Sequence, residues 1–305
     1  MPLDPAAQAW LDRLVAMGTP PVSQLTPQQA REARILPPAG PDVFRVDDMQ
    51  AAGPEGPIPL RLYWPSDATN LPILVWYHGG GWVVGDLETG DATCRRLCNL
   101  AQCIVINVDY RLAPEAPYPA AVDDAYAAVV WAAQNAPRFR GDATRIAVGG
   151  DSAGGNLAAV VAQLLRDRGG PSLVRQLLIY PVCDAAMNTP SFHENDRYGL
   201  TPASMAYYWG HYCPPGTDAT QPGASPARAK SLAGLPPAHV VTAEYDPLRD
   251  EGNAYAEALK AAGVPVDFEE MEGQIHGSFN NAHLFPRAMQ AVETVGVALG
   301  AAFVG

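Results

Sequence analysis

The chain has 305 residues, 48% of them hydrophobic, and a formal net charge of −12. This length and apolar content are enough for one sizeable core and exclude a disordered chain. The acidic balance excludes nucleic acid as a partner, because phosphate binding needs clustered Lys and Arg.

The sequence carries no signal for a membrane or for export. Residues 1–5 include no basic stretch followed by an apolar one, and no run approaches the ~18 apolar residues of a membrane span. We therefore expect a cytoplasmic protein without a membrane span.

The five cysteines are few and odd in number for a disulfide framework. Cys94 and Cys98 are spaced i, i+4 in a predicted helix, which raises the question of a metal site. A tetrahedral zinc site needs further ligands nearby. Buried free thiols are therefore the preferred interpretation.

Predicted strands alternate with predicted helices along the chain. Two early strands, at residues 43–49 and 58–64, flank a turn rich in Gly and Pro. Short apolar runs typical of buried strands follow at residues 73–77, 104–108, 145–148, 176–180, 239–243 and 266–270. Helical patterns occupy residues 91–101, 120–135, 153–168 and 249–262. This alternation predicts an α/β fold with eight strands.

Two stretches do not fit the alternation. Residues 1–40 begin with an amphipathic helix, and residues 184–230 hold aromatic side chains among Pro, Gly and polar residues. A segment this long in a compact sheet domain usually has its own structure or forms a lid. We expect an N-terminal cap segment at residues 1–42 and a cap insertion at 184–230, over a catalytic domain made of 43–183 and 231–305.

The strongest local motif is a G-x-S-x-G at residues 150–154, with Ser152 at its centre. It lies between a predicted strand and a predicted helix, which is the context of the nucleophile elbow of α/β-hydrolases. Its glycines remove side chains that would clash in so tight a turn. The helix N-terminus places backbone amides beside a developing negative charge. The motif predicts that Ser152 is a nucleophile.

A second motif, His78-Gly79-Gly80-Gly81-Trp82, directly follows the third predicted strand. Three glycines can present backbone amides without obstruction, as the oxyanion of a tetrahedral intermediate requires. An esterase places its glycine loop at this position. A flexible glycine-rich loop is the plain alternative. A phosphate cradle is excluded, because neither Gly-Lys-Ser/Thr nor G-x-G-x-x-G is present.

A nucleophilic hydroxyl needs a base and an orienting acid, in the chain order Ser, acid, His for this fold. His276 lies in a loop just past the last predicted strand, where that order places the base, and its neighbour His283 is expected on the final helix. Asp246, at the carboxyl end of the preceding strand, is the first candidate for the acid, and Glu244 is the second. Asp250 is better suited to the first turn of the next helix.

Together these motifs resemble those of the hormone-sensitive-lipase-like family of esterases, in particular its bacterial carboxylesterases with a GDSAG motif. The matching segments follow the family's order across most of residues 75–280, and they are residues 78–82, 109–115, 150–156, 246–250 and 275–277. Ser278 stands before Phe279, where relatives often place an aromatic side chain. This departure leaves the wall of the acyl pocket undefined.

The resemblance implies an α/β-hydrolase fold, with an eight-stranded, mostly parallel sheet flanked by helices and a helical cap. It also implies a serine carboxylesterase that hydrolyses short- to medium-chain acyl or aryl esters, with a small-molecule ester as partner and without a cofactor or metal. By position in the family motif, the amides of Gly80, Gly81 and Ala153 form the oxyanion hole. His78 and Gly79 shape the loop.

Other functions stay open in the sequence. A specialised deacylase or amidase would use the same residues, because selectivity lies in the pocket. A true lipase would need a large apolar surface patch. A non-catalytic ligand receptor would lack a catalytic residue, whereas Ser152, Asp246 and His276 are all present. The apolar strand edge at residues 266–270 could pair with the same strand of a second copy, so the sequence is compatible with a homodimer.

Overall fold

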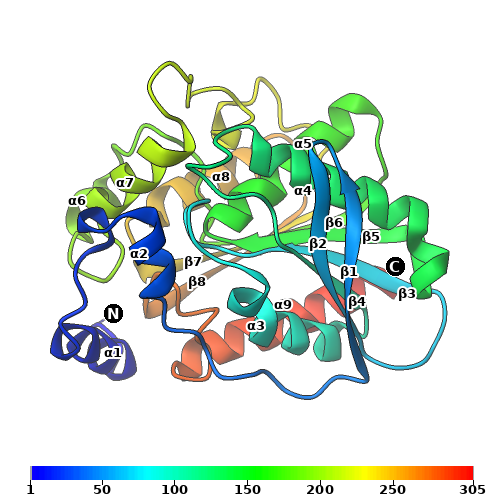
Figure 1. Cartoon of the computed structure of the whole chain (residues 1–305), viewed down its shortest axis with the longest axis horizontal. Helices are drawn as coiled ribbons and strands as arrows, with labels where there is room; N and C mark the ends of the chain where they lie inside the picture. The colour runs from blue at the N-terminus through cyan, green and yellow to red at the C-terminus, as the bar shows by residue number, and fades with distance from the viewer. Residues whose placement is uncertain (1, 305) are drawn as a thin grey trace.

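An eight-stranded sheet forms the centre of the computed structural model, which describes residues 2–304 (Figure 1). The strand order is β1-β2-β4-β3-β5-β6-β7-β8. β2 pairs antiparallel with β1 and β4, and all other pairs are parallel, which confirms the expected mostly parallel sheet. The strands are β1 (Arg45–Gly53), β2 (Gly56–Trp64), β3 (Leu71–Tyr77), β4 (Ile104–Val108), β5 (Gly141–Asp151), β6 (Leu173–Ile179), β7 (Ala238–Tyr245) and β8 (Val266–Ile275).

Helices cover both faces of this sheet (Figure 1), which explains why its central strands are continuously apolar. Successive strand residues point into two different cores, so that Val75 packs in one and Leu74 in the other. The first core contains α4 (Ala120–Asn135), α5 (Ala153–Arg168) and α8 (Arg249–Ala261), and the second contains α3 (Leu87–Ala101) and α9 (Pro286–Val304). None of the helices in residues 2–304 has both the length and the apolarity needed to cross a membrane.

Most of the predicted elements begin or end a few residues away from their bounds in the structure, as the start of α3, the end of β8 and the start of α9 illustrate. α3 begins at Leu87 rather than at residue 91, because the Asp86 carboxylate accepts from the Thr89 N–H and so caps the helix. β8 continues past residue 270 to Ile275. His283 lies in the turn before α9 and not on it, because the helix begins at Pro286.

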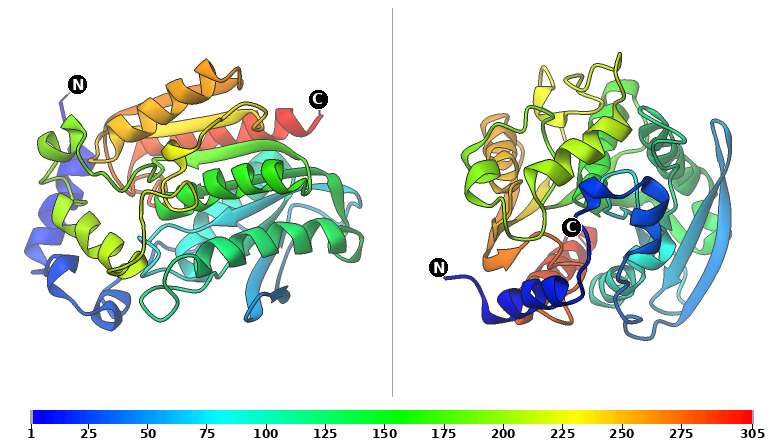
Figure 2. Two further views of the ribbon diagram at one scale, coloured as in Figure 1. Left: turned by 90° about the horizontal axis from the view of Figure 1, so that it is seen from above. Right: turned by 60° about the vertical axis from the view of Figure 1, so that its left-hand side comes forward.

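Two groups of short helices lie together on one side of the molecule (Figure 2). The first precedes the sheet in the chain and contains α1 (Pro5–Ala16), η1 (Val22–Gln24) and α2 (Pro27–Glu32). The second lies between β6 and β7 and contains α6 (Pro190–Glu194) and α7 (Pro202–Tyr212), whereas η3 (Pro226–Arg228), which follows in the chain, packs on α5. Both groups line a cavity at the carboxyl end of β8, where His276 follows the strand. This is the position at which a cap would cover a site.

Candidate active site

The chain turns sharply at Ser152, between the end of β5 and the start of α5. Its φ of +55° is rare for a residue with a side chain and marks a strained position. The turn is tight enough that a Cβ on Gly154 would lie 1.9 Å from the carbonyl oxygen of Tyr77. Glycine is therefore required at residue 154, and the serine hydroxyl projects from the turn.

Ser152, His276 and Asp246 are brought together from the ends of three strands. The Nε2 atom of His276 lies 3.0 Å from the Ser152 Oγ, and its Nδ1 lies 2.6 Å from the Asp246 Oδ2. With the Nδ1 proton donated to the carboxylate, Nε2 is free to accept the hydroxyl proton. The three residues thus have the geometry of nucleophile, base and orienting acid.

The environment of Asp246 separates it from the other candidate acids. Its side chain is completely buried, and its Oδ1 accepts from the Leu248 N–H at 2.9 Å. Glu244 instead accepts from the Gly273 N–H, and Asp250 lies in the first turn of α8 and accepts from the Ser191 N–H. Asp246 is the carboxylate that contacts His276.

The glycine loop after β3 faces the same point. Gly80 and Gly81 both have positive φ values, +121° and +58°. Their amides donate to no acceptor among residues 2–304, and Ala153, at the first position of α5, has no intrahelical acceptor. These are the three amides expected to bind an oxyanion, and they lie in or beside the cavity that Ser152 lines.

His78 and Gly79 support this loop from below. The His78 ring stacks on Tyr110 at 4.4 Å, and its Nδ1 lies 2.7 Å from the Gly79 carbonyl oxygen. Burial lowers the pKa of His78 to about 4, so its ring is neutral at neutral pH. A neutral ring with its proton on Nδ1 donates to that carbonyl and fixes the loop conformation.

The α7 helix holds the loop from above. The ring of Tyr208 covers Gly81 so closely that a Cβ there would lie 2.2 Å from the ring. The next residue, Trp82, stacks on Tyr212 with ring centroids 4.1 Å apart. The loop is therefore fixed between the sheet and the insertion.

Two cavities meet at His276. The smaller, of about 250 Å³, contains Ser152, the glycine loop and the residues after His276. The larger, of about 590 Å³, is lined mostly by apolar side chains of the N-terminal segment, including Leu11, Leu14 and Leu25. Both also contact Tyr208, which places this ring between them.

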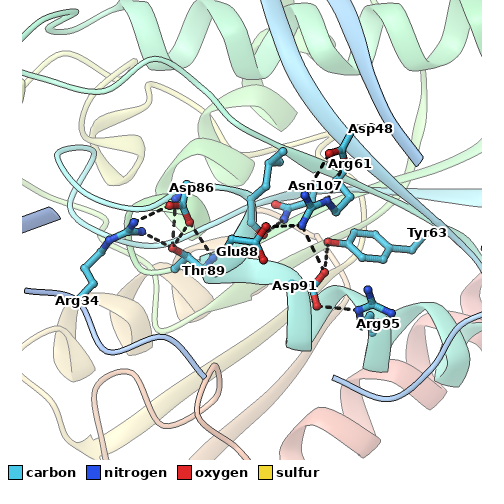
Figure 3. A network of polar contacts seen from close by, with 11 residues as sticks. Arg34, Asp48, Arg61, Tyr63, Asp86, Glu88, Thr89, Asp91, Arg95 and Asn107 are labelled. Atoms are coloured by element: carbon cyan, nitrogen blue, oxygen red, sulfur yellow. Dashed lines mark hydrogen bonds and ion pairs between the residues drawn. The ribbon is translucent and has the colours of Figure 1, made fainter. Parts of the chain in front are cut away.

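Two arginines attach the N-terminal helices to the site. Arg34 donates to Asp86 and Thr89, at the start of α3 (Figure 3). Burial would raise the pKa of Asp86, but the hydrogen bond and charge of Arg34 lower it to about 2. Arg31 donates to the Val83 carbonyl, next to the glycine loop, and forms a two-pronged ion pair with Glu115. The cavity wall is thus fixed to the loop by charge-assisted hydrogen bonds.

Several of these residues are absent from the sequence prediction. Arg34 and Asn280 line the smaller cavity but belong to no motif, and only their contacts in the fold reveal them. Asp151 lies within the G-x-S-x-G, but the motif assigns it no role. Within residues 2–304, no group of three or more His, Cys, Asp or Glu side chains is placed to hold a metal.

Glu251 is a further buried carboxyl group beneath the site. It is 5% exposed, and its Oε1 accepts from the Cys183 N–H at 2.6 Å. Burial, together with the charges of Asp246 and Asp184, raises its pKa to about 8. The folded protein therefore keeps this proton across a pH range in which the unfolded chain has lost it, and stability falls as pH rises from about 4.5 to about 8.

We expect Glu251→Gln to remove that loss, because the amide keeps the Oε1 acceptor and cannot ionise. Between pH 5.5 and 7, the free energy of unfolding should fall by about 1.4 kcal/mol less per pH unit in the variant than in the wild type, and the difference should shrink toward pH 8. Urea unfolding at several pH values measures this slope. Glu257→Gln, exposed on the same helix, is the matched control. Equal slopes for wild type and Glu251→Gln would contradict the prediction.

Comparison with known proteins places this chain among ester hydrolases. A family model described as alpha/beta hydrolase fold matches residues 74–280. Esterase LipI of Mycobacterium tuberculosis is 45% identical over 273 residues, covering 87% of this chain and 85% of the relative. Carboxylesterase NlhH of the same organism is 49% identical over 245 residues, covering 77% and 75%. The structure of a hyperthermophilic esterase from Pyrobaculum calidifontis superposes with a TM-score of 0.93 at 41% identity, covering all of both chains.

Proposed function

The chain belongs to the alpha/beta hydrolase fold family and is a carboxylic ester hydrolase, and on this premise we propose that it acts through Ser152, His276 and Asp246. The observation that supports this most is the continuous hydrogen-bonded series from the Ser152 Oγ through His276 to the buried Asp246. Its substrates are small-molecule esters.

The first half of the reaction forms an acyl-enzyme. His276 Nε2 takes the hydroxyl proton as the Ser152 Oγ attacks the ester carbonyl carbon. The charge that develops on the carbonyl oxygen is bound by the amides of Gly80, Gly81 and Ala153. The bond to the alcohol then breaks as His276 gives its proton to the leaving oxygen, and the acyl group stays on the serine.

The second half repeats these steps with water. His276 removes a proton from a water molecule, whose oxygen attacks the acyl carbon. The bond to the Ser152 oxygen breaks, the serine regains its proton from His276, and the acid product leaves. Asp246 stabilises the imidazolium in both halves through the Nδ1–H hydrogen bond.

The two cavities support a preference for short- to medium-chain acyl esters. The smaller cavity has room for the reacting ester group, and the apolar lining of the larger one suits an alkyl chain. We assign the acyl chain to the larger cavity, under the N-terminal cap segment of residues 1–42. The cap insertion of residues 184–230 contributes Leu200 and Tyr208 to the same wall.

The function is tested with p-nitrophenyl acetate, butyrate and octanoate, and with p-nitroacetanilide. Each buried methylene contributes about 0.8 kcal/mol, so kcat/KM should rise up to about tenfold from acetate to butyrate. The anilide should react far more slowly than any of the esters. An anilide rate equal to the ester rates would show an amidase, and no reaction with any ester would contradict the proposal.

A matched pair of variants tests the cavity assignment in the same series. Leu14→Trp fills the larger cavity and should lower the octanoate-to-acetate ratio of kcat/KM by about tenfold. Ala16→Trp adds the same ring at an exposed position of α1 and should leave the ratio unchanged. An unchanged ratio in Leu14→Trp would mean that the acyl chain does not occupy this cavity.

A further inference from the structure

The carboxylate of Asp151 joins three parts of the site that are far apart in the chain. It ends β5, immediately before the nucleophile, and the residue is 3% exposed. Its Oδ1 accepts from the Gly79 N–H at 2.9 Å, at the start of the glycine loop. Its Oδ2 accepts from the Asn280 Nδ2 at 2.6 Å, in the turn that follows His276. One side chain thus fixes the position of both loops relative to Ser152.

The hydrogen bonds of Asp151 extend through Asn280 to α3, and the carboxylate is closely packed against the glycine loop. The Asn280 Oδ1 accepts from the Thr93 hydroxyl at 3.1 Å, which ties the histidine turn to α3. The carboxylate lies so close to the glycine loop that a Cβ on Gly79 would be 2.3 Å from its Oδ2. The start of the loop can therefore move only if Asp151 also moves.

Asp151 also lies within electrostatic range of the proposed base. Burial raises the pKa of Asp151 to about 6, and the Gly79 N–H, the charge of protonated His276 and the Asn280 amide oppose that rise. The interaction is reciprocal, so a negative Asp151 stabilises the imidazolium. The hydroxyls of Tyr110 and Tyr180 lie near the same carboxylate, and burial raises the pKa of each well above its usual range, so both are uncharged.

The other ionisable groups near the site are neutral or already paired, so Asp151 is the further carboxylate that can stabilise the imidazolium. Cys94 faces the same carboxylate, and burial raises the pKa of its thiol well above the usual range. Arg34 lines the cavity but is paired with Asp86. Asp246 contacts the other nitrogen of His276, and below it the pKa of Glu251, raised by burial to about 8, keeps that group neutral through the acidic range.

We propose that Asp151 is a positioning residue for ester hydrolysis, whose buried carboxylate holds the glycine loop and the histidine turn against the nucleophile and stabilises the imidazolium formed during the reaction. This rests on the proposed roles of Ser152 and His276. Asp151 would thus be a second carboxylate that acts on the imidazole, by its charge and without the direct contact that Asp246 makes.

Asp151→Asn removes the negative charge and keeps the hydrogen bonds, because the new side-chain amide and that of Asn280 can both flip by 180°. The oxygen of the new amide still accepts from Gly79, its nitrogen donates to the Asn280 oxygen, and the Asn280 nitrogen donates to Thr93. We expect kcat for p-nitrophenyl butyrate to fall about tenfold. The acidic limb of kcat/KM should also move, because Asp151, whose pKa burial raises to about 6, changes charge in that pH range in the wild type and cannot ionise in the variant.

Asp151→Ala and Asn280→Ala remove the connection itself. Asp151→Ala leaves the Gly79 N–H buried without an acceptor, and kcat should fall by about 100-fold or more as the loop amides lose their position. Asn280→Ala removes only the bond to the histidine turn and keeps the bond from Asp151 to Gly79, so kcat should fall less than in Asp151→Ala. Asp142→Asn, at the opposite end of β5, is the control and should keep both kcat and the acidic limb.

The outcomes distinguish this inference from the proposed function. Wild type and Ser152→Ala are assayed alongside from pH 5 to 9. An inactive wild type, or an active Ser152→Ala, contradicts the function itself. A serine-dependent wild type with an unmoved acidic limb in Asp151→Asn, or with kcat within about twofold in Asp151→Ala, overturns the role of Asp151 alone.

Discussion

Ser152→Ala should lower kcat for p-nitrophenyl butyrate by about 10⁴-fold or more, because no acyl-enzyme can form without the Oγ. The oxyanion amides and the cavities remain, so a small rate above that of water should persist. Alanine has a Cβ like serine and meets the same backbone geometry at φ +55°, so the fold should be kept. A fluorophosphonate probe, which bonds to a nucleophilic serine, should label the wild type once and the variant not at all.

Ser231→Ala is the control for this experiment, because Ser231 is exposed and contacts Arg166 in the last turn of α5, at the other end of that helix from Ser152. It should keep both the rate and the labelling. If Ser152→Ala retains kcat within about tenfold of wild type, or is still labelled, the nucleophile lies elsewhere.

Asp246→Asn should lower kcat by about 10⁴-fold while the site keeps its shape. The Leu248 N–H holds the oxygen at the Oδ1 position, so the new amide nitrogen must face His276 Nδ1. Two donors cannot share that hydrogen bond, and the imidazole is forced to carry its proton on Nε2. In that tautomer it cannot accept the proton of Ser152. Steady-state kinetics from pH 6 to 9 measures the loss.

Two substitutions nearby test whether the effect belongs to Asp246. Glu244→Gln and Asp250→Asn change carboxylates that bond to backbone N–H groups and not to His276. Each should keep kcat within about tenfold of wild type. A large loss in Glu244→Gln with an active Asp246→Asn would move the orienting acid to Glu244, the second candidate in the sequence.

The central sheet could be predicted from the sequence because its strands are covered on both faces and therefore read as unbroken apolar runs. β8 is different. It lies at the edge of the sheet, and exposed acids such as Glu272 interrupt its pattern, so its extension to Ile275 was not visible. Apolar periodicity also predicts too late a start for α3, because Asp86 caps the helix through a side-chain contact that such a pattern does not contain.

The residues of the site also fall into some that the sequence predicts and others that it does not. Ser152, Asp246 and His276 each directly follow a strand. The order of the elements alone therefore predicts that all three lie at the carboxyl ends of the parallel strands. Asn280 and Arg34 reach the site through loops whose paths depend on tertiary packing. Nothing in their spacing in the sequence predicts those paths, and a motif search passes over them.

The attachment of the N-terminal helices has a consequence for how proteins of this kind diversify. Most of the wall around the larger cavity comes from a segment that Arg31 holds to Val83, next to the glycine loop, and that Arg34 holds to the start of α3. The proposed catalytic residues stand instead at the ends of strands. With the acyl chain in this cavity, as proposed, changes in residues such as Leu14 or Leu25 should alter which esters fit without disturbing the chemistry. Selection can retune substrate range in one stretch of chain while the inherited reaction stays intact in another, and a laboratory exchange of residues 1–42 between relatives would follow the same division.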